Sequence, residues 1–364
     1  MYLQKISIHN YKNIGDCSLE FSPKLNCVNG NNGCGKTNLL DAVYYLSMTK
    51  SFFLHGDQYT FRYGESEAAL VGDYVSADET LERISVALHK GGEKNIRRGS
   101  KPYTRLADHI GLIPIVMVSP ADSSLINESG EERRRFMNAL LSQTDRRYLR
   151  SMQAYNQFLM QRNKMLKMEN PDPILLGTIN EQIAPYADYI YNKRKELCTE
   201  LRPLVEDYYA KLSGDAEPIS MHYHSDLKDG SLTRLLEEEA EKERILKYTT
   251  VGIQRDDIFF NLGGHPIKKC GSQGQQKTFL LALKLAQQAL MRNLYGFSPI
   301  LLLDDVFDKL DMHRVENLLK LVASEEFGQI FITDSNKVRI SEVVSRAGAD
   351  CSIFTVENGE YKKE

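Results

Sequence analysis

The sequence predicts an α/β fold in which both ends of the chain build one mostly parallel sheet, interrupted by a helical insertion. Apolar runs that end in polar or acidic residues occur in "LIPIVMV" (112–118), "PILLLDDVF" (299–307) and "GQIFITDSN" (328–336). Such runs, alternating with helical patterns, are typical of strands buried on both faces of a parallel sheet. The middle of the chain is rich in charge and poor in β-branched runs, which favours helices.

The composition is that of an ordinary globular protein. The 364 residues are 42% hydrophobic and 26% charged, and the formal net charge of −3 argues against a surface uniformly adapted to nucleic acid. Six scattered cysteines without metal-site spacing indicate reduced thiols. No apolar run has the length of a membrane span, and the N-terminus lacks the apolar core of a signal peptide. We therefore expect a cytoplasmic protein.

The elements of the first third alternate between strand and helix patterns. Apolar residues alternate with polar ones over 17–21, and a short run then ends at Asn29, so two strands are predicted. From Lys36 onward the apolar residues fall on one side of a helix. Residues 67–118 are predicted to form further strands.

Two series of apolar residues between 131 and 246 keep the spacing of a helical seam, and "ENPDP" (169–173) separates them. The spacing fits a coiled-coil-like hairpin, and an ordinary buried helix face fits it equally well. The series are Tyr148, Met152, Tyr155, Leu159 and Leu166, and then Ile190, Leu197, Leu201, Leu204 and Tyr208. We predict a discontinuous head of residues 1–120 and 247–364, and a helical insertion of residues 121–246.

The segment "GNNGCGKT" (30–37) satisfies the phosphate-loop pattern G-x-x-x-x-G-K-[ST] between a predicted strand and a predicted helix. Glycines let successive backbone N–H groups converge on one anion, and the helix N-terminus favours phosphate. Lys36 would place its charge on the β- and γ-phosphates, and the Thr37 hydroxyl would ligate Mg²⁺. The predicted nucleotide-binding residues here are Gly30, Asn31, Asn32, Gly33, Cys34, Gly35, Lys36, Thr37 and Asn38.

An acidic pair follows the apolar strand predicted within "PILLLDDVFDKLD" (299–311). Open α/β sheets bind ligands at the carboxyl ends of their strands, which is where Asp304 and Asp305 would lie. We predict that Asp304 holds the metal and that Asp305 orients or deprotonates the attacking water, with Lys36 as the second catalytic residue. A solvated acidic turn is the alternative, but it would not need a buried strand before it.

A third segment, "GSQGQQKTFLLALKLAQQ" (271–288), places a small polar turn before an amphipathic helix. The turn forms a second helix N-terminus suited to an anion, and two such termini in one chain suggest a site completed across a dimer. The predicted nucleotide-binding residues of this turn are Ser272, Gln273, Gly274 and Gln275. Together with the two motifs above, the segment resembles the signature motif of ABC-type ATPases.

The resemblance narrows to the RecF family, bacterial DNA-repair members of the ABC/SMC-like ATPases. It runs nearly end to end through "NYKNI" (10–14), "VSPADSSLI" (118–126), "RRRFMNALLSQTDRRYLRSMQAYNQFLMQRN" (133–163) and "TTVGIQRDDIFF" (249–260). The chain departs from the family pattern at Ala121, where Glu is usual, and at Ile253 and Gln254, where Pro and His are usual.

The resemblance implies an ABC-type head that dimerises around two ATP molecules with Mg²⁺. Each site would pair one subunit's loop with the Ser272–Gln276 turn of the other. It also implies binding of double-stranded and gapped DNA, and slow, DNA-stimulated hydrolysis of ATP to ADP and phosphate. The cellular role would be loading of RecA at gaps during recombinational repair, replication restart and the SOS response, with RecR and RecO as partners. Asp305, shorter than the Glu of many ABC ATPases, agrees with slow turnover.

The segment "KGGEKNIRRGSKPYTR" (90–105) carries six basic residues and one acidic residue. Its candidate DNA contacts are Lys94, Arg97, Arg98 and Lys101, and an ordinary solvated loop explains it equally well. The arginines at 133–135 are a second candidate, unless they pair with Glu131, Glu132 or Asp145.

Three other functions share parts of this pattern. A transporter ATPase subunit would more usually carry Leu-Ser-Gly-Gly-Gln, and a chromosome-scaffold SMC protein would need helical arms of hundreds of residues. An ATP-switched DNA-binding clamp, in which hydrolysis is incidental, uses the same residues as the repair ATPase and remains open.

Overall fold

The computed structural model describes residues 1–76, 78–214, 217–347 and 350–364, and the chain divides into two compact units. The head unit comprises Met1–Ser123, Asp207–Ala216 and Gln273–Glu364, and the insertion unit comprises Ser124–Glu206 and Glu217–Ser272. Residues 247–272, which the sequence analysis assigned to the head, therefore group with the insertion unit. Residues 121–123 and 207–214, which it assigned to the insertion, group with the head unit. The two units are described separately.

A six-stranded sheet of the head unit is built from both ends of the chain, as predicted. Its order is β15-β14-β3-β13-β12-β8, and every pairing is parallel except that of β14 with β15. Every residue of β3, β8, β12 and β13 is buried, which explains the apolar runs of β8, β12 and β13. The strands are β3 (Leu25–Asn29), β8 (Ile115–Val118), β12 (Ile300–Asp304), β13 (Ile330–Asp334), β14 (Cys351–Glu357) and β15 (Glu360–Lys363).

The second sheet of the head unit is antiparallel, in the order β2-β1-β4-β5-β6-β7. Burial alternates along β4 because only one face of this sheet packs on the core. The strands are β1 (Tyr2–Tyr11), β2 (Ile14–Glu20), β4 (Glu67–Val75), β5 (Leu81–His89), β6 (Lys94–Arg98) and β7 (Lys101–Pro102). Short 3₁₀ turns precede and follow the β4–β7 meander at Asp57–Tyr59 (η1), Leu106–Asp108 (η2) and Pro120–Ser123 (η3).

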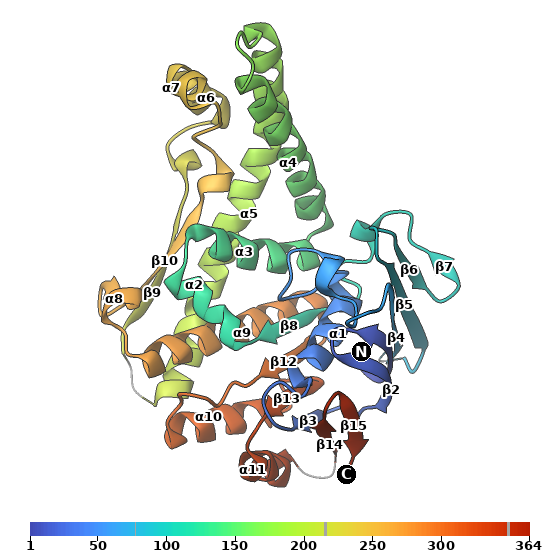
Figure 1. Cartoon of the computed structure of the whole chain (residues 1–364). Helices are drawn as coiled ribbons and strands as arrows, with labels where there is room; N and C mark the ends of the chain where they lie inside the picture. Colours follow the sequence, from blue (N-terminus) through green and yellow to red (C-terminus); the bar gives the residue numbers. More distant parts are fainter. Residues whose placement is uncertain (77, 215–216, 348–349) are drawn as a thin grey trace. The chain divides into compact units, whose positions relative to one another are not determined.

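Helix α1 (Lys36–Met48) contacts both sheets of the head unit (Figure 1). Eleven of its thirteen residues are buried, so the one-sided apolar face predicted from sequence understates its burial. Buried Asp41 accepts hydrogen bonds from the Tyr11 hydroxyl at 2.7 Å and the Ser51 hydroxyl at 2.8 Å, and pairs with the Lys12 ammonium at 2.6 Å. The "NYKNI" segment thus fixes α1 against the antiparallel sheet.

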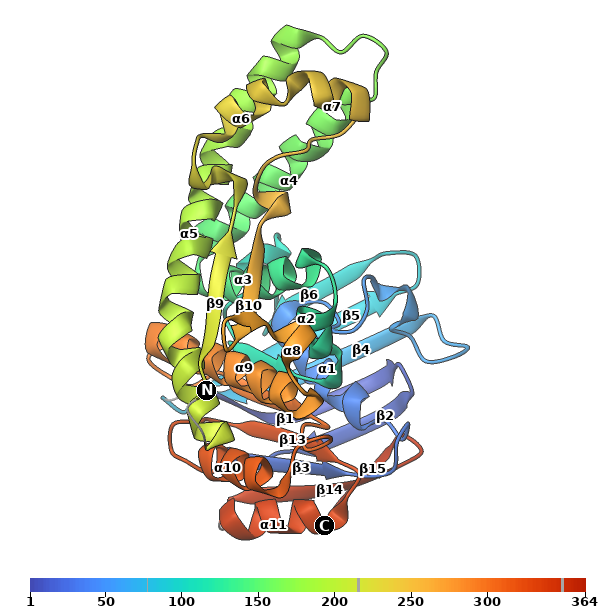
Figure 2. The same cartoon turned by 90° about the vertical axis from the view of Figure 1, so that its left-hand side faces the viewer.

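Three further helices complete the head unit: α9 (Gln273–Tyr295), α10 (Met312–Val322) and α11 (Lys337–Ala347). Helix α11 packs against β3 and β13, and α10 lies beside α11 (Figure 2). Buried Lys284 of α9 pairs with Asp122 at 2.7 Å and donates to the carbonyl of Met117 at 2.9 Å, which joins α9 to β8. Across the described ranges, no helix has the length and apolar composition needed to cross a membrane.

The insertion unit contains the predicted helical hairpin, with its break at the predicted place. Helix α4 ends at Leu166 and α5 begins at Pro173, and the rings of Phe158 and Tyr186 stack across them with centroids 5.9 Å apart. The helices are α2 (Ser124–Asn127), α3 (Gly130–Thr144), α4 (Arg146–Leu166), α5 (Pro173–Ser213, which enters the head unit at Asp207), α6 (Leu232–Glu238), α7 (Ala240–Leu246) and α8 (Ile267–Cys270).

The insertion unit also holds a small antiparallel sheet that the sequence analysis did not predict. Its order is β11-β10-β9, formed by β9 (Ile219–His224), β10 (Asp257–Leu262) and β11 (His265–Pro266). The backbone pairing of β10 with β9 ties residues after 247 to the insertion unit, and this pairing explains the shifted boundary.

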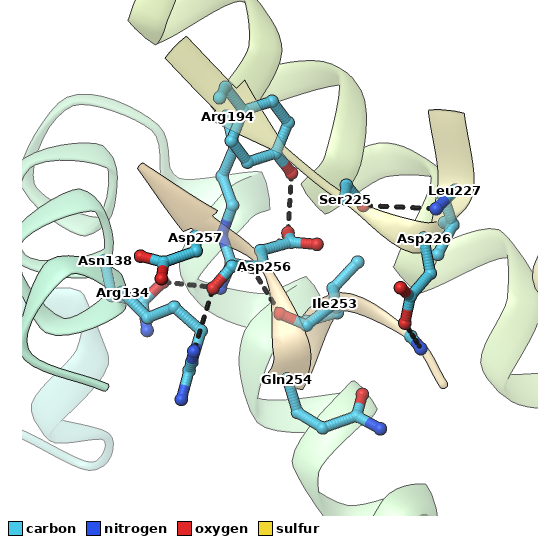
Figure 3. A network of polar contacts seen from close by, with 12 residues as sticks. Arg134, Asn138, Arg194, Ser225, Asp226, Leu227, Ile253, Gln254, Asp256 and Asp257 are labelled. Carbon is cyan, nitrogen blue, oxygen red and sulfur yellow. Dashed lines mark hydrogen bonds and ion pairs between the residues drawn. The ribbon is translucent and has the colours of Figure 1, made fainter. Parts of the chain in front are cut away.

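A buried polar network anchors the segment "TTVGIQRDDIFF" within the insertion unit (Figure 3). The Arg194 guanidinium of α5 donates to the Asp256 carboxylate at 2.6 Å and to the carbonyl of Ile253 at 2.7 Å. Arg133 forms a two-pronged ion pair with Asp257, with distances of 2.5 and 2.9 Å. Gln254, which replaces the usual His, donates to the carbonyl of Val251 and accepts from a tyrosine hydroxyl. Both acids of this segment therefore stabilise the unit.

Replacing Arg194 by Met should lower the free energy of unfolding by about 3–5 kcal/mol, because Asp256 would stay buried without its cation. Arg135→Met is the matched control, since Arg135 is half-exposed and, among the described residues, forms ion pairs only with Glu131 and Glu132 on its own helix. That control should cost at most about 1 kcal/mol. Urea unfolding measures both, and equal costs would contradict a stabilising role for the buried pair.

Candidate nucleotide-binding site

The phosphate-loop segment connects β3 to α1 and depends on glycine at specific positions. Gly33 and Gly35 have φ values of 82° and 118°, which side chains of L-residues rarely adopt. Gly30 needs to lack a Cβ for a different reason, because that atom would lie 2.5 Å from the carbonyl oxygen of Val356. The loop therefore requires glycine both for its turn and for close packing on β14.

The Lys36 ammonium lies inside the loop. It donates to the carbonyl oxygen of Gly30 at 2.6 Å and to that of Asn31 at 3.0 Å, and the residue is buried. Neither carbonyl is a counter-ion for the ammonium, so this position suits an anionic ligand.

The Thr37 hydroxyl meets the Asp304 carboxylate at the end of β12. It donates to the two carboxylate oxygens at 3.0 and 2.9 Å, and the Thr333 hydroxyl donates to the same group at 2.7 Å. Burial, the largest effect, raises the pKa of Asp304, and these hydrogen bonds oppose the rise. A hydroxyl and a carboxylate in contact are the oxygen donors that Mg²⁺ prefers, so the residues fit that ion.

Asp305 follows directly and has a left-handed backbone with φ of 48°. Its backbone N–H donates to the Thr333 hydroxyl at 3.0 Å, so Thr333 of β13 contacts both acids. A non-glycine residue in this conformation costs free energy and is held in place by its surroundings.

These groups surround one cavity of about 290 Å³, close to the lower end of the range for small-molecule sites. Two predicted motifs, residues 30–38 and 304–305, thus come together in the head unit. Of the described residues of the third motif that lie in this unit, Gln273, Gly274 and Gln275, none lines the cavity. The lining residues are Asn32, Gly33, Gly35, Lys36, Thr37, Asn38, Asp304 and Asp305.

Sequence reasoning missed the residues that brace the loop from outside. The Tyr361 hydroxyl donates to the carbonyl of Gly35 at 2.9 Å, and the Gly359 N–H donates to that of Cys34 at 2.9 Å. The Asn38 amide donates to Asn13 at 2.6 Å. The "NYKNI" motif pointed to the Asn13 region, but no local pattern indicates that the β14–β15 hairpin contacts the loop.

The four predicted DNA contacts differ in their surroundings. Lys94 pairs with Asp57 at 2.7 Å, and Arg98 forms a two-pronged pair with Glu82 at 2.7 and 2.5 Å. Arg97 and Lys101 are exposed. Within the hairpin of β6 and β7, Arg97 and Lys101 are therefore the better candidates for a ligand.

Comparison with known proteins decides the family. A family described as AAA ATPase domain matches residues 1–211. The DNA replication and repair protein RecF of Parabacteroides distasonis is 44% identical over 362 residues, which cover 100% of this chain and 99% of that protein. The chain belongs to the RecF family. Its membership in an ATPase family follows from the same matches.

Solved structures agree with this RecF-family assignment. One described as the recombination mediator protein RecF-ATP in the RecFOR pathway has a TM-score of 0.89 and 28% identity, covering 100% of this chain and 97% of that chain. The Smc head domain from Pyrococcus furiosus, bound to part of ScpA, has a TM-score of 0.58 and 16% identity, covering 100% and 96%. The second likeness concerns the fold alone, and the predicted ABC/SMC-like head is confirmed.

Gly30→Ala should lower the free energy of unfolding by about 1–3 kcal/mol and weaken nucleotide binding, because its Cβ would displace either β14 or the loop. Gly56→Ala is the control: its φ of −167° suits any residue, and its Cβ would meet nothing within 4 Å. Chemical unfolding and the nucleotide-induced rise in Tm measure the two effects. Equal behaviour of the two variants would contradict the close packing of loop and hairpin.

Proposed function

We propose that the chain is a DNA-repair ATPase that binds ATP and Mg²⁺ in the cavity of the head unit. The observation that carries this proposal is the contact between Thr37 of the loop and Asp304 of β12 beside the Lys36 ammonium. Phosphoryl transfer to water needs a positive charge beside the phosphates and oxygen ligands for Mg²⁺, and Lys36, Thr37 and Asp304 place these groups within one cavity. The solved RecF-ATP relative supports the choice of nucleotide.

The proposed reaction is slow hydrolysis of ATP to ADP and phosphate, stimulated by DNA. Lys36 would neutralise charge on the β- and γ-phosphates, while Thr37 and Asp304 would hold Mg²⁺, which supplies further neutralisation of the phosphates. Asp305, which lines the same cavity, would orient or deprotonate the water.

We further propose that ATP closes a homodimer. The cavity is lined by the first two motifs and by none of Gln273, Gly274 and Gln275, so a second copy of the chain would supply the third motif. In that arrangement Ser272–Gln275 of one subunit would close the γ-phosphate side of the other subunit's site.

The proposed cellular role is binding of double-stranded or gapped DNA and support of RecA loading in the cytoplasm. RecR and RecO would be its partners in recombinational repair, replication restart and the SOS response. Membership in a family of DNA replication and repair proteins supports this role, as does the RecFOR description of a solved relative. The exposed bases Arg97 and Lys101 would contribute to DNA contact.

Light scattering with no nucleotide, ADP or ATP should show dimers with ATP alone, and Lys36→Ala should abolish them. Asp305→Asn should retain or prolong the dimer while turnover falls by at least about tenfold, because it removes the base but not the phosphate contacts. A dimer that forms and dissociates normally in Asp305→Asn, with DNA function intact, would favour the clamp in which hydrolysis is incidental. ATP-independent dimers would contradict the shared site.

Reversing Arg97 and Lys101 to Glu should weaken duplex binding and make the negative slope of log K against log salt shallower by roughly 1.8, about 0.9 for each lost phosphate contact. Arg234→Glu with Lys242→Glu, in exposed pairs of the insertion unit, is the charge-matched control. Fluorescence titrations at several salt concentrations measure the slope. An unchanged slope would remove the β6–β7 hairpin from the DNA interface.

A further inference from the structure

The turn that follows β12 carries two left-handed residues that are not glycine. Asp305 has φ of 48° and Lys309 has φ of 62°. Each costs free energy in isolation, so contacts from neighbouring elements are needed to hold the turn. At the start of the turn, the backbone N–H of Asp305 donates to the hydroxyl oxygen of Thr333 in β13 at 3.0 Å.

Lys277, the fifth residue of α9, also contacts this turn. Its ammonium donates to the carbonyl of Asp308 at 2.6 Å and to the carbonyl of Asp305 at 3.3 Å. Lys277 is partly buried, and burial lowers its pKa, while Asp308 and Asp305 oppose this change. The charged lysine thus acts as a cap for the carbonyl groups of a strained turn.

Lys277 connects two parts of the proposed catalytic machinery inside one head unit. Gln273, Gly274 and Gln275 form the first turn of α9, and Lys277 follows on the same rigid helix. The Lys277 ammonium donates to the Asp305 carbonyl, so a hydrogen bond connects the backbone of Asp305 to the helix that carries the third motif. A movement of this helix terminus would therefore reach the Asp305 carboxylate without passing through the nucleotide.

We propose that Lys277 is a positioning residue for hydrolysis, which aims Asp305 into the cavity and links its position to the first turn of α9. This inference rests on the proposed function. Lys277 acts on the Asp305 backbone and does not line the cavity, so its loss should change turnover and leave nucleotide binding unchanged.

The first test compares Lys277→Met with Lys309→Met. Lys309 is an exposed lysine of the same turn, so its substitution removes one charge and keeps both carbonyl bonds of Lys277. Lys277→Met should lower kcat at least tenfold with KM and ATP affinity within twofold of wild type, and Lys309→Met should change neither. If Lys277→Met unfolds, Lys277→Gln serves for the same comparison. Equal kcat values for the Lys277 and Lys309 variants would overturn the inference.

The second test places Lys277→Met in the Asp305→Asn background, under single-turnover conditions with long incubation. If Lys277 works through Asp305, the double variant should hydrolyse ATP no more slowly than Asp305→Asn alone. A further tenfold loss would show an independent effect and would overturn the inference while the role of Asp305 stands. Wild-type turnover in Asp305→Asn would instead overturn the proposed mechanism and this inference together.

Discussion

Parallel pairing of β3 with β13, and of β13 with β12, is the constraint on which the nucleotide-binding cavity depends. Because parallel strands end at the same edge, the loop after β3 and the acids after β12 meet although Thr37 and Asp304 are 267 residues apart. β13 lies between β3 and β12, and its Thr333 hydroxyl donates to the Asp304 carboxylate at the same edge. Without this pairing, neither motif would face the other.

Two buried aspartates show how the same side chain serves different purposes in the two units. Asp256 in the insertion unit is neutralised by the Arg194 guanidinium at 2.6 Å, which makes it a structural group. Asp304 in the head unit is held by hydroxyl groups, and within the described ranges no basic side chain lies at ion-pair distance from it. Hydroxyl donors leave the negative charge uncompensated, so the second site retains an attraction for a cation.

The features predicted from sequence are those with a local signature. The glycines of 30–35, the apolar strand before Asp304 and the break at 169–173 each follow from residues that are adjacent in the chain. Long-range contacts had no such signal: β9 lies in a charge-rich region, and the pairing of Lys94 with Asp57 joins strand β6 to the separate η1 turn. Burial of α1 on both sides likewise follows from a second sheet, which helical periodicity alone cannot reveal. Tyr361 escaped notice because its partner, Gly35, is 326 residues away.

The distance along the chain between Thr37 and Asp304 also bears on how the protein is made. A nascent chain completes its phosphate loop early, yet the acid that faces it is synthesised only after 267 further residues. In the meantime the partners of β3 on both sides, β13 and β14, are missing, and the unpaired backbone N–H and C=O groups along its two edges are open to wrong pairing. Folding of the head unit must therefore wait for closure of a very large loop, a high contact order that slows the search for the native topology. Until β13 and β14 have been synthesised, both edges of β3 are therefore sites for pairing with a non-native strand.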